Sequence, residues 1–183
     1  MPIAQDLSIK ANFDFFNLPA DITDDSPILR ALRLYVRTRR DDVLHDLKTA
    51  GIIEQHLNKQ NLVTTRGRNV LARLLAGDTT YSGEINYGAL GSSSTAVANS
   101  DTQLGTEVYR KIFASQSTDG NNVAYADFFY TAAETSGTYQ EFGTFIDGTA
   151  SANTGRIFSH ILTGGWVKSG AQTLFISAQY TIS

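Results

Sequence analysis

LFISAQYTI, residues 174–182, places an apolar side chain at every second position. Successive side chains of an extended chain point to opposite faces, so a period of two predicts a β-strand with one buried face. The side chains on that face are Leu174, Ile176, Ala178, Tyr180 and Ile182. We expect this strand to be one wall of the core.

The same pattern recurs upstream through the second half of the chain. Further strands are predicted over residues 85–89, 123–130, 139–146 and 157–162, with Asp147-Gly148 as a turn after one of them. Short strands separated by glycine-rich and asparagine-rich turns favour an antiparallel arrangement. The predicted class is α+β, mainly an antiparallel, jelly-roll-like β-sandwich with an N-terminal extended arm and two helices.

Two helices are predicted before the strands. The first begins at Ser26-Pro27, with serine as N-cap and proline in the first turn, and ends at Gly51. The second covers about residues 65–76 and ends at Gly77. A helical turn is also expected over residues 104–110.

A change in charge predicts two regions. Ten of the fifteen Lys and Arg residues lie between residues 30 and 73, whereas the last hundred residues carry four. We assign residues 1–55 to an N-terminal arm and helix that dock to a partner, and residues 56–183 to the β-rich domain. Within the arm, residues 1–25 are expected to be extended and to pack on something, for example a neighbouring subunit.

The composition limits the classes of function. A chain of 183 residues is long enough for one domain with a sizeable core. The net charge of −3 provides no general attraction for nucleic acid, and the lack of cysteine excludes thiol chemistry. No apolar run is long enough to span a membrane. The N-terminus lacks the pattern of a secretion signal, so we expect synthesis in a cytoplasm.

No pattern of catalytic, cofactor-binding or metal-binding residues is predicted, and the chain is not expected to be an enzyme. His45, His56 and His160 lack the spacing of a metal site. Ser159 and His160 are adjacent on a predicted strand, so their side chains point to opposite faces and cannot form a nucleophile–base pair.

A basic stripe and a group of phenylalanines are the candidate partner interface. The arginines follow helical spacing beside the apolar face of the first helix, and the phenylalanines make the arm too apolar for a free tail. The residues are Arg30, Arg33, Arg37, Arg40, Phe13, Phe15 and Phe16. The alternatives for the stripe are a solvated face balanced by aspartates, or a nucleic-acid contact. An acidic chain without a nucleic-acid-binding module favours the solvated face or a protein partner.

Consecutive aromatic residues indicate association with further protein. Phe128-Phe129-Tyr130 places rings on both faces of one strand. One face is core, and the other needs a cover, which can be a second layer, a loop or another chain. We therefore expect a homo-oligomer.

Several short motifs resemble structural proteins of tailed bacteriophages. Residues 61–77, NLVTTRGRNVLARLLAG, resemble a helix start found in that class. Residues 85–111 resemble its apolar strand, small-residue loop and Asp-Thr-x-Leu-x-x-Glu segment followed by a basic pair. Residues 141–148, 155–160, 166–169 and 174–182 complete the resemblance, which covers about residues 60–183.

The resemblance implies a virion protein of the tail, baseplate, fibre or neck. Its partners would be copies of itself and other virion proteins, and it would be assembled in the host cytoplasm. Two alternatives are a capsid or decoration protein and a carbohydrate-binding or receptor-binding module that contacts a host-surface glycan.

Overall fold

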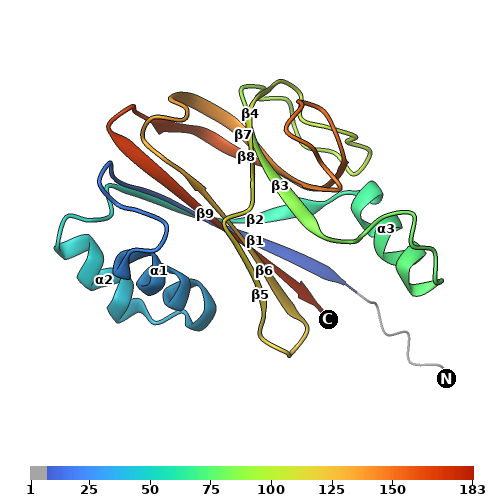
Figure 1. Cartoon of the computed structure of the whole chain (residues 1–183), viewed down its shortest axis with the longest axis horizontal. Helices are drawn as coiled ribbons and strands as arrows, with labels where there is room; N and C mark the ends of the chain where they lie inside the picture. Colours follow the sequence, from blue (N-terminus) through green and yellow to red (C-terminus); the bar gives the residue numbers. More distant parts are fainter. Residues whose placement is uncertain (1–7) are drawn as a thin grey trace.

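The computed structural model describes residues 8–183, which form nine strands and three helices (Figure 1). The strands are β1 (Ile9–Pro19), β2 (Gln55–Val63), β3 (Ile85–Gly91), β4 (Glu107–Ile112), β5 (Ser115–Thr118), β6 (Val123–Tyr130), β7 (Gly137–Ile146), β8 (Arg156–Lys168) and β9 (Gln172–Ile182). The helices are α1 (Pro27–Thr38), α2 (Asp41–Thr49) and α3 (Thr65–Leu75). The predicted α+β class with mainly antiparallel strands is confirmed.

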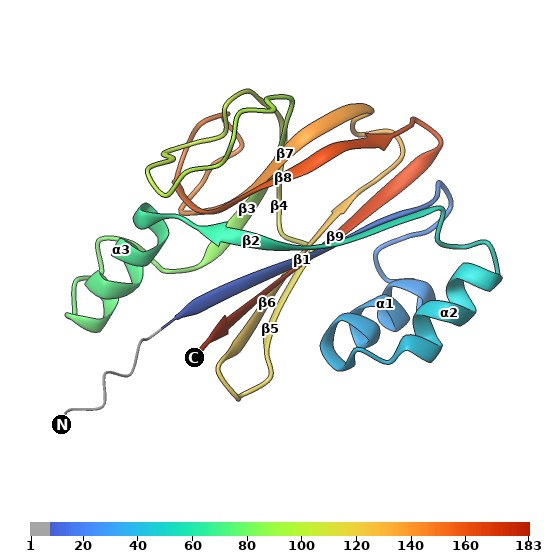
Figure 2. The same ribbon diagram turned by 180° about the vertical axis from the view of Figure 1, so that it is seen from behind.

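All nine strands belong to one curled antiparallel sheet in the order β4-β3-β7-β8-β2-β1-β9-β6-β5. Strand β2 joins the two halves, because it pairs with β1 along most of its length but with β8 only at Leu62 and Val63. Figures 1 and 2 show the curl from both sides, with β3, β4, β7 and β8 above and the other half below. A jelly-roll-like connection of the strands remains a prediction.

The two terminal strands of the sheet are consecutive in the sequence. Only Phe113 and Ala114 separate β4 from β5. The Phe113 N–H donates to the carbonyl of Asn86 in β3, at an N···O distance of 3.1 Å. The Ala114 N–H donates to the carbonyl of Asp127 in β6, at 2.7 Å. One bent run of chain therefore brings the two ends of the sheet together and makes it a half-barrel.

Aromatic side chains fill the inside of the curl and hold its halves together. The Phe142 ring of β7 lies 5.6 Å from the Phe13 ring, 5.7 Å from the Phe15 ring and 5.7 Å from the Phe128 ring, between ring centroids. These edge-to-face pairs each add about 0.5–1.5 kcal/mol beyond the burial of area. The core expected of a sandwich is thus present, although a single sheet provides both walls.

The N-terminal segment is an interior strand of the sheet. Strand β1 pairs with β2 on one side and with β9 on the other. Its alternation directs Phe13 and Phe15 into the curl and Phe16 to the outer face, and all three are completely buried. The extended backbone predicted over residues 1–25 is correct for residues 9–19, which pack within their own chain, whereas turns occur within residues 20–25. The part of the prediction that concerns residues 1–7 lies outside the described residues. The expected division at residue 55 falls at the start of β2, inside this continuous sheet.

Helices α1 and α2 cover the outer face of the half that contains β1. Ser26 caps α1 as predicted, since its hydroxyl accepts the Leu29 N–H at 3.2 Å. The predicted single helix is two helices, because Arg39 adopts a left-handed conformation with φ of 54°. Its N–H caps α1 through the Tyr35 carbonyl, and its guanidinium reaches Asp14 of β1.

Two other local predictions have different outcomes. The helix expected near residues 65–76 is α3, which Thr64 caps by accepting the Gly67 N–H at 3.0 Å. The helical turn expected over residues 104–110 is wrong, because β4 begins at Glu107 and pairs with β3.

Candidate functional site: an apolar opening beside α3

A groove of about 430 Å³ lies between α3 and the adjacent ends of β1 and β9. Its lining residues are Ile9, Arg68, Leu71, Ala72, Leu74, Leu75 and Ile182. Leu75 is 85% exposed and Ile182 is 41% exposed, although both are large apolar residues. An exposed apolar surface of this kind is typical of an interaction site.

The way in which α3 docks explains why the groove is open. The first turn of the helix touches β8 closely, because a Cβ on Gly67 would lie 2.6 Å from the carbonyl oxygen of Phe158. The Thr64 hydroxyl also donates to the carbonyl of Ile157 at 2.7 Å. Val70 is buried one turn later, whereas Leu75 at the far end is exposed. The helix is therefore held at its N-terminal end, and its apolar C-terminal end lines the groove.

Two neighbouring hollows extend the groove towards β5. A hollow of about 240 Å³ shares Ile9, Leu71 and Ile182 with the groove. The next, of about 380 Å³, shares Ile85 and Tyr180 with that hollow. We refer to the groove and these two hollows together as the apolar opening.

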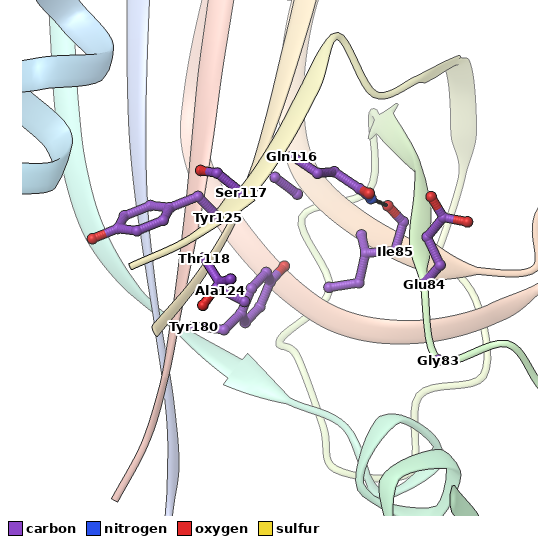
Figure 3. A pocket seen from close by; sticks show the side chains of 10 residues that line it. Gly83, Glu84, Ile85, Gln116, Ser117, Thr118, Ala124, Tyr125 and Tyr180 are labelled. Carbon is purple, nitrogen blue, oxygen red and sulfur yellow. Dashed lines mark hydrogen bonds between the residues drawn. The ribbon is translucent and has the colours of Figure 1, made fainter. Parts of the chain in front are cut away.

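The far end of the apolar opening lies where the two ends of the sheet approach each other (Figure 3). The Gln116 side chain of β5 donates to the carbonyl of Ile85 in β3 at 2.5 Å. This bond joins the terminal strand β5 to β3, the neighbour of the other terminal strand, and Figure 3 shows the Tyr180 ring close to both residues. Charged side chains contribute little to the lining: they are Arg68 at the groove and Glu84 at this far end.

A buried cluster of a histidine and two carboxylates lies on the outer face of β7 and β8. His160 Nε2 is 2.8 Å from a Glu141 oxygen, and His160 Nδ1 is 2.7 Å from an Asp101 oxygen. His160 and Glu141 are buried, and the Asp101 side chain is mostly covered. Within residues 8–183, no group of His, Asp and Glu side chains is placed to hold a metal ion.

The predicted arginine stripe is formed in part. Arg30, Arg33 and Arg37 belong to α1, whereas Arg40 lies beyond the break at Arg39. Arg33 Nε lies 3.1 Å from an oxygen of buried Asp127, and Arg37 donates to the Ser117 hydroxyl at 2.9 Å. Arg40 pairs with exposed Asp42, and Arg30 is exposed. The stripe thus attaches α1 to the sheet through Arg33 and Arg37.

The outer face also holds a second buried aspartate, at Asp14. Its oxygens lie 2.8 Å from Arg39, 3.0 Å from His56 Nε2 and 2.9 Å from the Asn58 amide. Burial alone would raise the pKa of Asp14, but the hydrogen bonds from His56 and Asn58 and the charge of Arg39 lower it below its usual value. The carboxylate is therefore held ionised.

The phenylalanines assigned to the partner interface are accounted for by the fold. Phe13 and Phe15 belong to the core inside the curl, and Phe16 stacks on His56 with 4.5 Å between ring centroids. The residues that sequence reasoning missed are Leu75 and Ile182, whose exposure depends on how α3 docks. It also missed the contact of His160 with Glu141, which depends on the register of β7 and β8.

Comparisons with known proteins identified no relative of this chain. No protein-family model matches the chain, and neither does any curated protein or solved structure. Each helix formed within residues 8–183 is too short or too polar to cross a membrane.

Proposed function

We propose that this chain is a non-enzymatic structural protein that assembles with copies of itself through the apolar opening. The observation that carries the proposal is the exposure of Leu75 and Ile182 beside the groove. Full burial of one leucine or isoleucine side chain contributes about 1.5–3 kcal/mol. In a contact with twofold symmetry, both copies use the same patch, so Leu75 and Ile182 of each copy would be buried.

The particle to which the protein belongs is proposed from the resemblance of residues 60–183 to tailed-bacteriophage structural proteins. The motif of residues 85–111 includes β3, the segment after it and most of β4, and that of residues 141–148 includes the second half of β7. We assign the protein to the tail or its appendages, docked to other virion proteins. A capsid or decoration protein is the alternative within the same class.

A carbohydrate-binding module has less support from the positions of the aromatic residues. Sugar platforms need exposed rings, whereas the aromatic residues of the strands are largely inside the protein. Those that are buried include Phe128, Phe129, Tyr130, Tyr139, Phe142, Phe145 and Phe158. Glycan binding by the purified protein would favour this alternative over the proposed assembly function.

The test compares two leucines that are exposed on different helices. Leu75 of α3 lines the groove, whereas Leu34 of α1 is 43% exposed on another helix. Sedimentation velocity should show an oligomer for the wild type and a monomer for Leu75→Glu, because the substitution would bury an unpaired carboxylate in the contact. Leu34→Glu, the matched control, should sediment like the wild type. An oligomer that is unchanged by Leu75→Glu would contradict the proposed surface.

A further inference from the structure

The segment of residues 92–106, between β3 and β4, lies across the outer face of the sheet. Leu104 packs there against Ala89, Phe145 and Ile157. Gly143 makes room for it, since a Cβ on this glycine would lie 2.9 Å from a Leu104 methyl group. Residues 92–106 thus cover one half of the sheet, and Leu104 is the side chain that packs on it. We refer to residues 92–106 as the cover.

Glu141 of β7 binds both ends of this cover. One carboxylate oxygen accepts the N–H groups of Ser93 at 3.2 Å and Thr106 at 2.8 Å, and the other accepts that of Gly105 at 3.0 Å. A Cβ on Gly91 would lie 2.5 Å from this carboxylate, so the glycine leaves space for it. Hydrogen bonds from three backbone groups require an acceptor, which an ionised carboxylate provides.

His160 of β8 joins the Glu141 carboxylate to the middle of the cover. Its two ring nitrogens face different carboxylates, those of Glu141 and Asp101. Asp101 in turn accepts the Ala98 N–H at 2.8 Å. A neutral imidazole has one N–H donor and an imidazolium has two. Both contacts can be hydrogen bonds to ionised carboxylates only if the ring carries two protons.

We propose that His160 is a pH-dependent clamp, which holds residues 98–101 against the sheet while its ring is doubly protonated and releases them when the ring loses a proton. In the neutral form, one of the two ring nitrogens faces a carboxylate without a proton between them. Of the two ionised carboxylates, Asp101 is the less buried and belongs to the cover, so the contact with Asp101 is the one that opens.

Charge and burial determine the direction of the pH effect. Burial alone would lower the pKa of His160, but its hydrogen bonds to Glu141 and Asp101 and their charges raise it above the ordinary value of 6.5. Burial would raise the pKa of Glu141, but the hydrogen bonds from His160 and from the backbone N–H groups lower it below 4.5.

The two shifts define the pH range of the clamp. The contribution of His160 to stability is complete below the unfolded pKa of 6.5 and is lost as the pH rises through the raised pKa of the folded state. The contribution of Glu141 to stability is complete above pH 4.5, its pKa in the unfolded chain, and is lost as the pH falls through the lowered pKa of the folded state. The clamp is therefore fully closed between pH 4.5 and pH 6.5 and opens on the alkaline side.

The charged groups on the other packed elements have partners of their own. Arg68 of α3 donates to the carbonyl of Val63, to Thr65 and to the Asn99 side chain. Lys59 of β2 donates to the carbonyl of Leu162. The Asn99 contact keeps the cover attached beside α3 when the clamp opens, so we expect local loosening and not detachment.

The experiment follows the ring and the cover together by NMR on the full chain. Nitrogen shifts of labelled histidine should show doubly protonated His160 at about pH 6, with its titration midpoint above the ordinary histidine value of 6.5. The protection of the Ala98 amide against hydrogen exchange should fall about tenfold between about pH 6 and about pH 9, after correction for the intrinsic rate.

Two variants make the test decisive. Asp101→Asn should lower the pKa of His160 and make the Ala98 protection independent of pH, because one charged partner of the ring is removed. His45→Ala, the control, should leave both properties unchanged. The proposal would be overturned if His160 titrated at or below the ordinary value of 6.5, or if wild-type Ala98 were equally protected at both pH values.

Discussion

Two covers lie on the outer face of the sheet, and buried ionic contacts hold each of them. Helix α1 is attached to one half by Arg33, which pairs with Asp127. The segment of residues 92–106 is attached to the other half by His160, which joins Glu141 to Asp101. The two covers differ in the side chain that carries the positive charge. Arginine stays charged at every pH near neutrality, whereas histidine loses its charge within a pH range close to neutrality.

The comparison shows how one sheet can carry a permanent cover and a conditional one. The Asp127 carboxylate also accepts the hydroxyls of Ser115 at 2.8 Å and Ser177 at 2.6 Å, so two further strands hold the contact of α1. The contact of Asp101 with the sheet depends on one titratable ring. The following substitutions test this difference, from the largest expected effect to the smallest.

Removing Asp127 should have the largest effect on stability. Asp127→Ala removes the carboxylate that accepts hydrogen bonds from Arg33, Ser115 and Ser177, while Arg33 keeps its pair with Asp24. Each hydrogen bond to a charged group contributes about 1.5–3 kcal/mol, and three are lost here. Urea denaturation should show a correspondingly lower free energy of unfolding. Asp42→Ala, which breaks an exposed pair with Arg40, is the control and should unfold like the wild type. Equal stabilities of the two variants would refute the role of Asp127.

Replacing His160 should have a smaller effect that depends on pH. His160→Gln keeps a polar side chain but removes the charge, and hydrogen bonds to charged groups contribute about 1.5–3 kcal/mol. Urea denaturation should find the variant about 2 kcal/mol less stable than the wild type at about pH 6. The difference in free energy of unfolding between the two proteins should decrease as the pH rises, because His160 of the wild type then loses the charge that the variant lacks. A difference that stays constant with pH would contradict the clamp.

Removing the cap of α1 should have the smallest effect. Ser26→Ala deletes the hydroxyl that accepts the Leu29 N–H, and loss of such an N-cap costs about 1 kcal/mol. Thermal unfolding followed by circular dichroism should show this loss equally at acidic and alkaline pH, since neither group titrates. Thr38→Ala, at the exposed end of the same helix, is the control and should have little effect. A pH-dependent loss for Ser26→Ala would show that the cover formed by α1 is not permanent.

Local signals predicted many of the elements. Strand β9 follows from its alternation, and α1 starts where the Ser26-Pro27 cap predicts. The break at Arg39 was not predictable from helical spacing, because the contact of its side chain with Asp14 comes from a distant strand. Nor could the position of β1 be predicted, since its partner β9 lies at the other end of the chain.

The candidate sites depend still more on tertiary structure. Helical spacing predicted part of the arginine stripe, namely Arg30, Arg33 and Arg37 of α1. One alternative was that nearby aspartates balance the stripe, and Arg40 does pair with Asp42 and Arg33 with Asp24. The second partner of Arg33, Asp127 in the distant strand β6, was not predicted. The clamp depends on register: His160 lies opposite Gly143, which brings Glu141 within reach two residues along β7. A shift of one residue would send these side chains to opposite faces. Both strands were predicted from the sequence, but not which of their residues lie opposite one another.

The central claim is self-assembly through the apolar opening, and the mass of the full chain in solution tests it most directly. Light scattering after size exclusion, over a range of concentrations, compares the measured mass with the 19.9 kDa of one chain. We predict a defined multiple of that mass, which Leu75→Glu reduces to one chain. A mass of 19.9 kDa at every concentration for the wild type would contradict the account.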